Sequence, residues 1–166
     1  MERLHVDNTH YPIFLYNPHD IWPLVPGRSK SEKAYYARFD QERKYGFYVI
    51  GGTTALDKQL RKQFDSAYFN IDLCAIPSFN RMDHITVLAH YVITVSLPSQ
   101  LAVELDLLYE RKDVTHAEQD IQRLLATPCR AKVKIERNST KAATLRKQLS
   151  KEFALSKRFV EEYGLF

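Results

Sequence analysis

Apolar and polar residues alternate along residues 84–97, and this pattern predicts a long, half-buried β-strand. Every second residue from Ile85 to Leu97 is apolar, whereas the intervening positions include His84, Thr86 and His90. Side chains on a strand point to opposite faces with a period of two residues. We therefore expect one strand, with an apolar face on the core and a polar face that carries the two histidines.

Four shorter segments also have strand composition. They are residues 11–16, 46–50, 70–76 and 130–136. Short apolar runs bounded by Gly, Pro and Asn are typical of strands. In the last segment, apolar residues alternate with Lys132, Lys134 and Glu136, so we expect that strand to carry a basic outer face.

Helical spacing of apolar residues predicts helices between the strands. These helices cover residues 31–43 and begin near Thr54, Pro98 and Thr115. A Ser or Thr followed three residues later by an acidic residue is typical of a helix N-terminus. Thr54 with Asp57 and Thr115 with Glu118 both fit this pattern. Two short helices are expected to finish the chain.

The order of these elements shows no regular βαβ repeat. It favours an α+β fold with a mainly antiparallel sheet, flanking helices and a C-terminal helical pair. The length of 166 residues suits one domain. We expect an α+β body over residues 1–136 and a basic helical C-terminal segment over residues 137–166, which is either part of the same compact unit or a small appendage.

Basic charge is concentrated near the C-terminus. Residues 130–158 contain ten Lys and Arg against two acidic residues, a balance of +8, whereas residues 1–129 contain 14 basic and 16 acidic residues, a balance of −2. Glu161 and Glu162 return the sum to the net charge of +4. A local charge of this size can neutralise several phosphates, which favours a nucleic-acid partner. The alternative is a basic surface that serves solubility alone.

The last two predicted helices share a distinct pattern of small and apolar residues. It comprises Leu149, Ser150 and Phe153 near the end of the first helix, Ala154 in the turn, Leu155, the capping residue Ser156, and Val160 and Tyr163 on the second helix. This pattern resembles the helix-turn-helix motif of DNA-binding proteins. In that motif a three-residue turn joins two helices, with small residues where the backbones approach and apolar residues where the helices pack.

The resemblance implies a DNA-binding regulator of transcription whose second helix enters the major groove. The nucleic-acid-binding residues that it predicts are Lys141, Arg146, Lys147 and Lys151 on the first helix, which would meet phosphates, and Lys157 and Arg158 at the start of the second. Duplex DNA is favoured over RNA. The larger body would then serve regulation or self-association, as a homo-oligomer or in a larger assembly.

Two alternative functions come from other parts of the sequence. His84-Ile-Thr86 resembles one half of the paired His-x-Thr motif of two-histidine phosphoesterases, which would make this chain an enzyme acting from the polar face of residues 84–97. A deep pocket over that face would favour this alternative, but we assign no catalytic residue. In the second alternative the chain is a structural or adaptor subunit of a ribonucleoprotein or protein assembly. The C-terminal residues expected to form an exposed apolar patch in that case are Phe159, Val160, Leu165 and Phe166.

Several residue types bear on cofactors and location. His5, Asp7, His10, His19 and Asp20 carry groups that could bind a transition metal, but their spacing matches no known motif, so we expect no metal and no cofactor. Two cysteines are too few for a disulfide framework, which favours a reducing, cytoplasmic setting. The sequence has no run of 18 apolar residues, so we expect no membrane partner.

Overall fold

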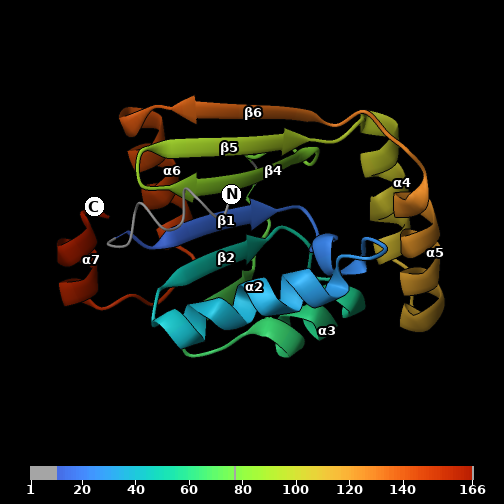
Figure 1. The fold of residues 1–166 in the computed structure, drawn as a ribbon, viewed down its shortest axis with the longest axis horizontal. Helices are drawn as coiled ribbons and strands as arrows, with labels where there is room; N and C mark the ends of the chain where they lie inside the picture. Colours follow the sequence, from blue (N-terminus) through green and yellow to red (C-terminus); the bar gives the residue numbers. More distant parts are fainter. Residues whose placement is uncertain (1–10, 77, 166) are drawn as a thin grey trace.

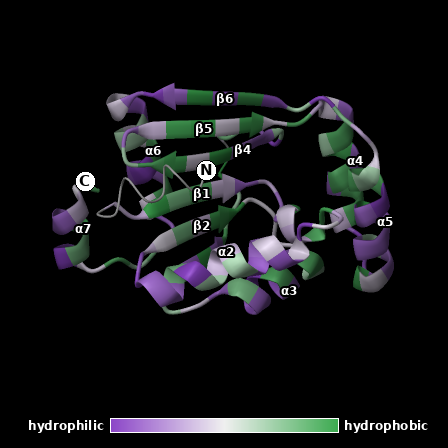
Figure 2. Cartoon of the chain, viewed as in Figure 1, coloured by the Kyte–Doolittle hydropathy of each residue, from purple (hydrophilic) through white to green (hydrophobic). Residues whose placement is uncertain are grey.

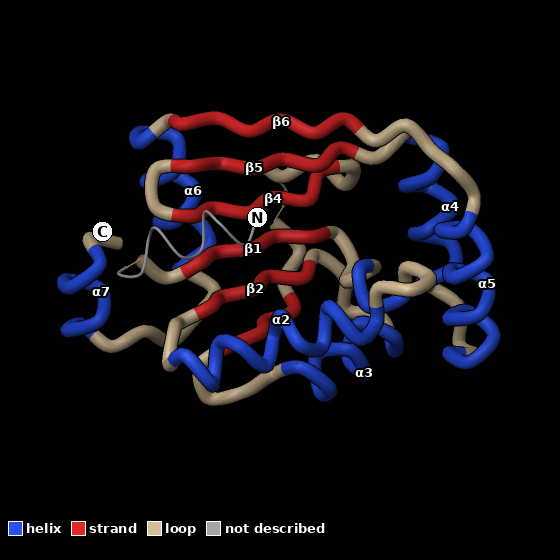
Figure 3. The backbone as a smooth tube through the Cα atoms, in the orientation of Figure 1, coloured by secondary structure: helices blue, strands red, loops and turns tan. Residues whose placement is uncertain are grey.

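The structure, a computed structural model, describes residues 11–76 and 78–165. Its strands are β1 (Ile13–Asn17), β2 (Gly46–Ile50), β3 (Phe69–Leu73), β4 (Asp83–Leu88), β5 (Tyr91–Ser96) and β6 (Lys132–Arg137). Its helices are the short 3-10 helix η1 (Trp22–Leu24), α2 (Ser29–Glu42), α3 (Ala55–Phe64), α4 (Ser99–Tyr109), α5 (Val114–Ala126), α6 (Ser139–Ser150) and α7 (Lys157–Tyr163). The protein is therefore mixed α/β, with helices around one sheet (Figure 3).

The six strands lie in the order β3-β2-β1-β4-β5-β6, and their pairing is mixed. β1, β2 and β3 pair in parallel, whereas β4, β5 and β6 continue the sheet antiparallel. The prediction of a mainly antiparallel sheet without βαβ repeats was therefore wrong, because β1-α2-β2-α3-β3 forms two consecutive βαβ units. Strands buried on both faces lack alternation, so their apolar runs do not reveal which way they pair.

Residues 84–97 form a hairpin and not the single strand predicted from their alternation. β4 and β5 are joined by Ala89 and His90, and Ala89 adopts the left-handed conformation at φ 48°. The turn reverses the chain, so odd-numbered residues of β4 lie on the same face of the sheet as even-numbered residues of β5. Ile85 therefore shares a face with Thr94, and Ile93 lies on the opposite face with Thr86.

Helices cover the two faces of the sheet unequally. α2 and α3 pack over β3, and the core between these helices and the parallel strands contains Tyr48, Phe69 and Leu56. α6 lies on the other face against β1, β2, β4 and β5, over a second apolar cluster. Figure 1 shows α4 and α5 side by side at the end of the sheet where β1 and β2 finish.

The local helix signals were partly correct. Thr54 caps α3, with the reciprocal hydrogen bonds to and from Asp57 that the sequence predicts. The expected capping role of Thr115 was wrong. α5 starts one residue before it, and the side chain of Asp113 accepts the hydrogen bond from the His116 backbone. The predicted C-terminal helical pair is present as α6 and α7.

β6 differs from the basic-faced strand expected at 130–136. Lys132 and Lys134 are exposed, but so are Val133 and Ile135, each at 61% on the opposite face. The α2 side of β6 therefore presents apolar side chains to solvent.

Figure 2 shows hydrophobic residues along the strands of the sheet and hydrophilic ones over much of α2 and α7. Over the described residues, every helix is too short or too polar to cross a bilayer.

Candidate nucleic-acid interface

α6 presents lysines because its sequence is amphipathic. The helix begins after Asn138, whose side-chain oxygen accepts the hydrogen bond from the Lys141 backbone at 2.9 Å. Ala142 and Leu149 are fully buried against the sheet. With 3.6 residues per turn, Lys141, Lys147 and Lys151 fall on the solvent side, and all three are exposed.

A groove of about 510 Å³ runs between β6, α6 and the loop before β4. Three lysines from two elements line it, namely Lys132 and Lys134 from β6 and Lys141 from α6. The other polar side chains in its wall are Ser78, Asn80, Asp83, Thr94, Ser96 and Gln148. Lysines surrounded by hydroxyl and amide groups are the usual partners of phosphate oxygens in nucleic-acid complexes.

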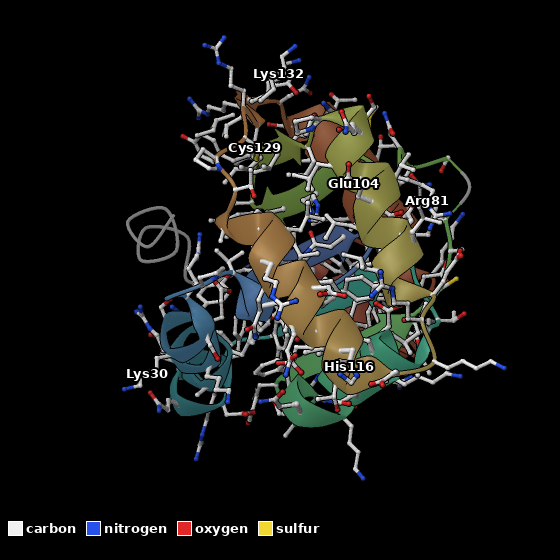
Figure 4. All side chains as sticks on the ribbon, turned by 90° about the vertical axis from the view of Figure 1, so that its right-hand side faces the viewer. Lys30, Arg81, Glu104, His116, Cys129 and Lys132 are labelled. Carbon is white, nitrogen blue, oxygen red and sulfur yellow. The ribbon has the colours of Figure 1, made fainter. Side chains whose placement is uncertain are left out.

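Two carboxylates partly neutralise the groove, because Asp83 lines it and Glu136 pairs with two of its lysines. Glu136 Oε1 lies 2.8 Å from Lys134 Nζ, and Glu136 Oε2 lies 2.6 Å from Lys141 Nζ. Hydrogen bonds from these two lysines hold the pKa of Glu136 below its usual value. Within the described part of the chain Lys132 makes no ion pair, and Figure 4 shows it at the outer margin of the molecule. Of the three lysines in the groove, Lys132 is therefore the one without a competing carboxylate in the described residues.

The structure places Arg146 away from the other predicted binding residues. It is 7% exposed, its guanidinium donates a hydrogen bond to the Ala89 carbonyl, and it lies over the Tyr11 ring. Burial lowers the pKa of Arg146. This residue anchors α6 to the β4–β5 turn, so we remove it from the interface. The sequence could not reveal this role, because the turn that Arg146 contacts lies far away along the chain.

α7 carries the two residues expected to read bases. Lys157 and Arg158 are both exposed at its start, and Ser156 caps the helix as predicted by accepting a hydrogen bond from the Phe159 backbone. The connection from α6 is longer than the expected three residues and spans residues 151–156. The added length lets the Phe153 ring pack 5.1 Å from the Phe47 ring.

The apolar residues of the C-terminus are used within the chain itself. Val160 is 5% exposed and Leu165 is 1% exposed, while Phe159 packs edge-on against Tyr45 and Phe47. These three residues do not form the exposed patch expected of an adaptor subunit, and Phe166 lies outside the described residues.

A buried polar cluster that the sequence did not predict lies under α4. His19 contacts Asp57 through Nδ1 at 3.0 Å and Asp106 through Nε2 at 3.1 Å, and its ring stacks on Tyr109. Both ring nitrogens of His19 contact carboxylates and the residue is 3% exposed, so the cluster links the loop after β1 to α3 and α4. In the sequence, the one local indication of this cluster is the run Asn-Pro-His-Asp at residues 17–20, which begins at the last residue of β1.

Asp20 lies in the same region with a tyrosine cage around it. Its Oδ1 accepts hydrogen bonds from Tyr48 and Tyr36, whereas Oδ2 has no partner within the described structure. Burial raises the pKa of Asp20 to about 7. No group of three or more potential metal ligands is found among the described residues. Of the five residues considered for a metal, His5, Asp7 and His10 lie outside that part.

A smaller pocket of about 150 Å³ covers the α2 side of β4 and β5. His84 and Thr86 line it together with Trp22 and Tyr36. Burial lowers the pKa of His84 to about 3. His90 lies in the turn at the far end of β4, so the structure does not bring the two histidines together as a phosphoesterase would require.

Comparisons with known proteins assign no family and no function to the groove or the pocket. Searches of protein-family models, of curated proteins and of solved structures each found no match to the chain.

Proposed function

We propose that this protein binds nucleic acid through a basic surface formed by β6 and α6, with duplex DNA as the favoured partner. The observation that carries the proposal is the groove in which Lys132, Lys134 and Lys141 converge. These lysines come from the segment with a balance of +8, so the sequence and the geometry direct positive charge to the same surface. Such a surface attracts a polyphosphate in a salt-dependent manner.

Other cations extend the proposed surface beyond the groove. Lys147 and Lys151 follow along the exposed side of α6, where they can contact further phosphates of the same backbone. Lys157 and Arg158 stand at the exposed start of α7. In the proposed complex the groove and α6 hold the phosphate backbone, and α7 supplies the contacts to base edges.

The experiment compares charge-neutralising variants of equal charge. The test variant carries Lys132→Gln, Lys134→Gln and Lys141→Gln, and the control carries Lys30→Gln, Lys33→Gln and Lys62→Gln, which are also exposed lysines. Binding to labelled duplex DNA is followed by fluorescence anisotropy at one salt concentration. We expect the test variant to bind roughly 10- to 100-fold more weakly and the control to bind like the wild type. Equal weakening of both variants would contradict the proposed surface.

Single-stranded DNA and duplex RNA serve as competitors in the same assay. The proposal expects duplex DNA to displace the probe at the lowest concentration, because an α-helix fits the major groove of B-form DNA and not the deep, narrow one of A-form RNA. Substitutions are preferable to removal of residues 139–166, since Ala142 and Leu149 are buried and the truncated chain would expose its core.

A second candidate function, the binding of a small molecule, is favoured by the pocket over β4 and β5. We propose that it holds one planar ring beside Trp22, with a hydrogen bond from His84. When the Asn17 amide is oriented so that its oxygen accepts from Trp22 Nε1, its nitrogen donates to His84 Nδ1 at 3.1 Å, and the proton of the neutral His84 ring is then on Nε2. Within the described residues Nε2 has no hydrogen-bond partner. A volume of about 150 Å³ suits a molecule of the size of benzene.

Titration with phenol tests the second candidate. We expect the NMR signals of the Trp22 indole and the His84 ring to shift in a saturable way in the wild type, and His84→Phe to weaken binding by roughly 10-fold through loss of the donor. Shifts that do not saturate, or that are unchanged in the variant, would contradict a specific site.

A further inference from the structure

We propose that two copies of this chain associate through β6, which pairs with its own copy in antiparallel orientation and extends the sheet across a twofold axis. β6 is the last strand in the sheet order and pairs with β5 on one side only. Figure 1 shows it along the margin of the sheet. Among residues 11–76 and 78–165, no strand pairs with the other side of β6, so that edge is open for hydrogen bonding.

The direction of the backbone groups on this edge follows from one hydrogen bond. The Asn138 backbone N–H donates to the His90 carbonyl at 2.8 Å, directly beyond the paired strands. Backbone groups of an antiparallel strand alternate in direction, so even-numbered residues of β6 face β5. The N–H and C=O groups of Val133, Ile135 and Arg137 therefore point outward, away from β5.

The two edge strands of the sheet, β3 and β6, differ in the burial of their apolar side chains. At the other edge, β3 has Phe69 and Ile71 almost fully buried, and α2 and α3 pack against the strand. On β6, Val133 and Ile135 are each 61% exposed. An exposed edge strand with apolar side chains and outward-pointing backbone groups is a template for pairing with another strand.

The charge pattern of β6 selects a second copy as the partner and fixes its register. With the twofold axis at Ile135, this residue stands opposite its own copy and Lys134 stands opposite Glu136 of the other chain. That register places an opposite charge across from Lys134 at the closest cross-strand distance. An axis at Lys134 would instead place two lysines opposite each other, which is unfavourable.

The expected association is moderate in strength. The register forms about six backbone hydrogen bonds between the chains, and one strand edge buries less area than an obligate dimer interface. We therefore expect a dimer whose fraction rises with protein concentration. The inference does not depend on nucleic-acid binding, because association is measured without nucleic acid.

Sedimentation equilibrium of the full chain tests the association. At protein concentrations up to about 200 µM, we expect the weight-average mass to rise from 19.4 kDa toward twice that value. Ile135→Lys places two like charges at the axis and should weaken association by roughly 10-fold or more. Leu107→Lys is the matched control, because Leu107 is also 61% exposed but lies on α4. A constant mass of 19.4 kDa, or equal weakening by both variants, would overturn the proposal.

A charge exchange tests the register. Lys134→Glu alone should weaken association, because two carboxylates then face each other across the strands. The double variant Lys134→Glu with Glu136→Lys should restore association to within roughly threefold of the wild type. Failure of the exchange to restore association would contradict the axis at Ile135. Nucleic-acid binding by a chain that stays monomeric would separate failure of this inference from failure of the proposed function.

Discussion

The parallel half of the sheet, β1 to β3, and the antiparallel half, β4 to β6, differ in how they are covered. β1 and β2 are buried at every residue, between α2 and α3 on one side and the cluster under α6 on the other. In the antiparallel half, burial decreases from β4 through β5 to β6. β1 and β2 therefore lie at the centre of the core, and the antiparallel half exposes progressively more of its side chains toward β6.

The largest expected effect is on the free energy of unfolding, and it compares a buried residue of the parallel half with an exposed residue of the antiparallel half. Phe69→Ala removes a fully buried ring that packs against Tyr36, Phe39 and Tyr48, and should lower the free energy of unfolding by about 4 kcal/mol. Ile135→Ala, at an exposed position, should change it by less than about 0.5 kcal/mol. Urea denaturation of both variants, followed by circular dichroism, measures the difference. Similar values would contradict the division into a buried and an open half.

A slightly smaller effect concerns pH and Asp20 in the parallel half. Burial raises the pKa of Asp20 in the folded state to about 7, above its unfolded value. Between these two pKa values the folded state retains a proton that the unfolded state has lost. Stability therefore falls as the pH rises toward and through the folded-state pKa of about 7. Between pH 5 and pH 8 this contribution is about 3 kcal/mol.

Asp20→Asn isolates that contribution, because the amide does not titrate. Urea denaturation at pH 5 and pH 8 should show that the wild type loses about 3 kcal/mol more than the variant. His84 in the antiparallel half has the opposite sign. Burial lowers its pKa to about 3, so its contribution is present above the unfolded value and is lost as the pH falls. An equal pH dependence in wild type and Asp20→Asn would show that Asp20 does not hold its proton near neutral pH.

The smallest of these effects on stability distinguishes a cation with a structural role, Arg146, from the cations proposed to bind DNA. Arg146→Met removes the hydrogen bond to the Ala89 carbonyl and should lower the free energy of unfolding by about 2 kcal/mol. Because Arg146 is buried, duplex-DNA affinity measured below the melting temperature should stay within about twofold of the wild type. A loss of affinity as large as that of the lysine variants would return Arg146 to the interface.

The sequence predicted what local chemistry determines. The run 46–50 matches β2 residue for residue, and the capping box of Thr54 with Asp57 starts α3 as expected. Both depend on residues that are neighbours in the chain. The prediction failed at the β4–β5 turn, because a two-residue connection continues the alternation of polar and apolar residues and so hides the reversal.

The candidate site was also predicted only where residues close together in the chain determine it. The exposure of Lys141, Lys147 and Lys151 follows from the amphipathic spacing of α6. The groove does not follow from it, because Lys132 reaches the site only through the pairing of β6 with β5. The His19 cluster likewise depends on Asp106, which is 87 positions away in the chain.

The dependence of duplex-DNA affinity on salt tests the central claim most directly. Each phosphate neutralised contributes about −0.9 to the slope of log K against log salt concentration. We predict a steep negative slope for the wild type, and a slope shallower by about 3 when Lys132, Lys134 and Lys141 are replaced by Gln. A flat slope, or the same slope in both proteins, would contradict binding of the phosphate backbone in the β6–α6 groove.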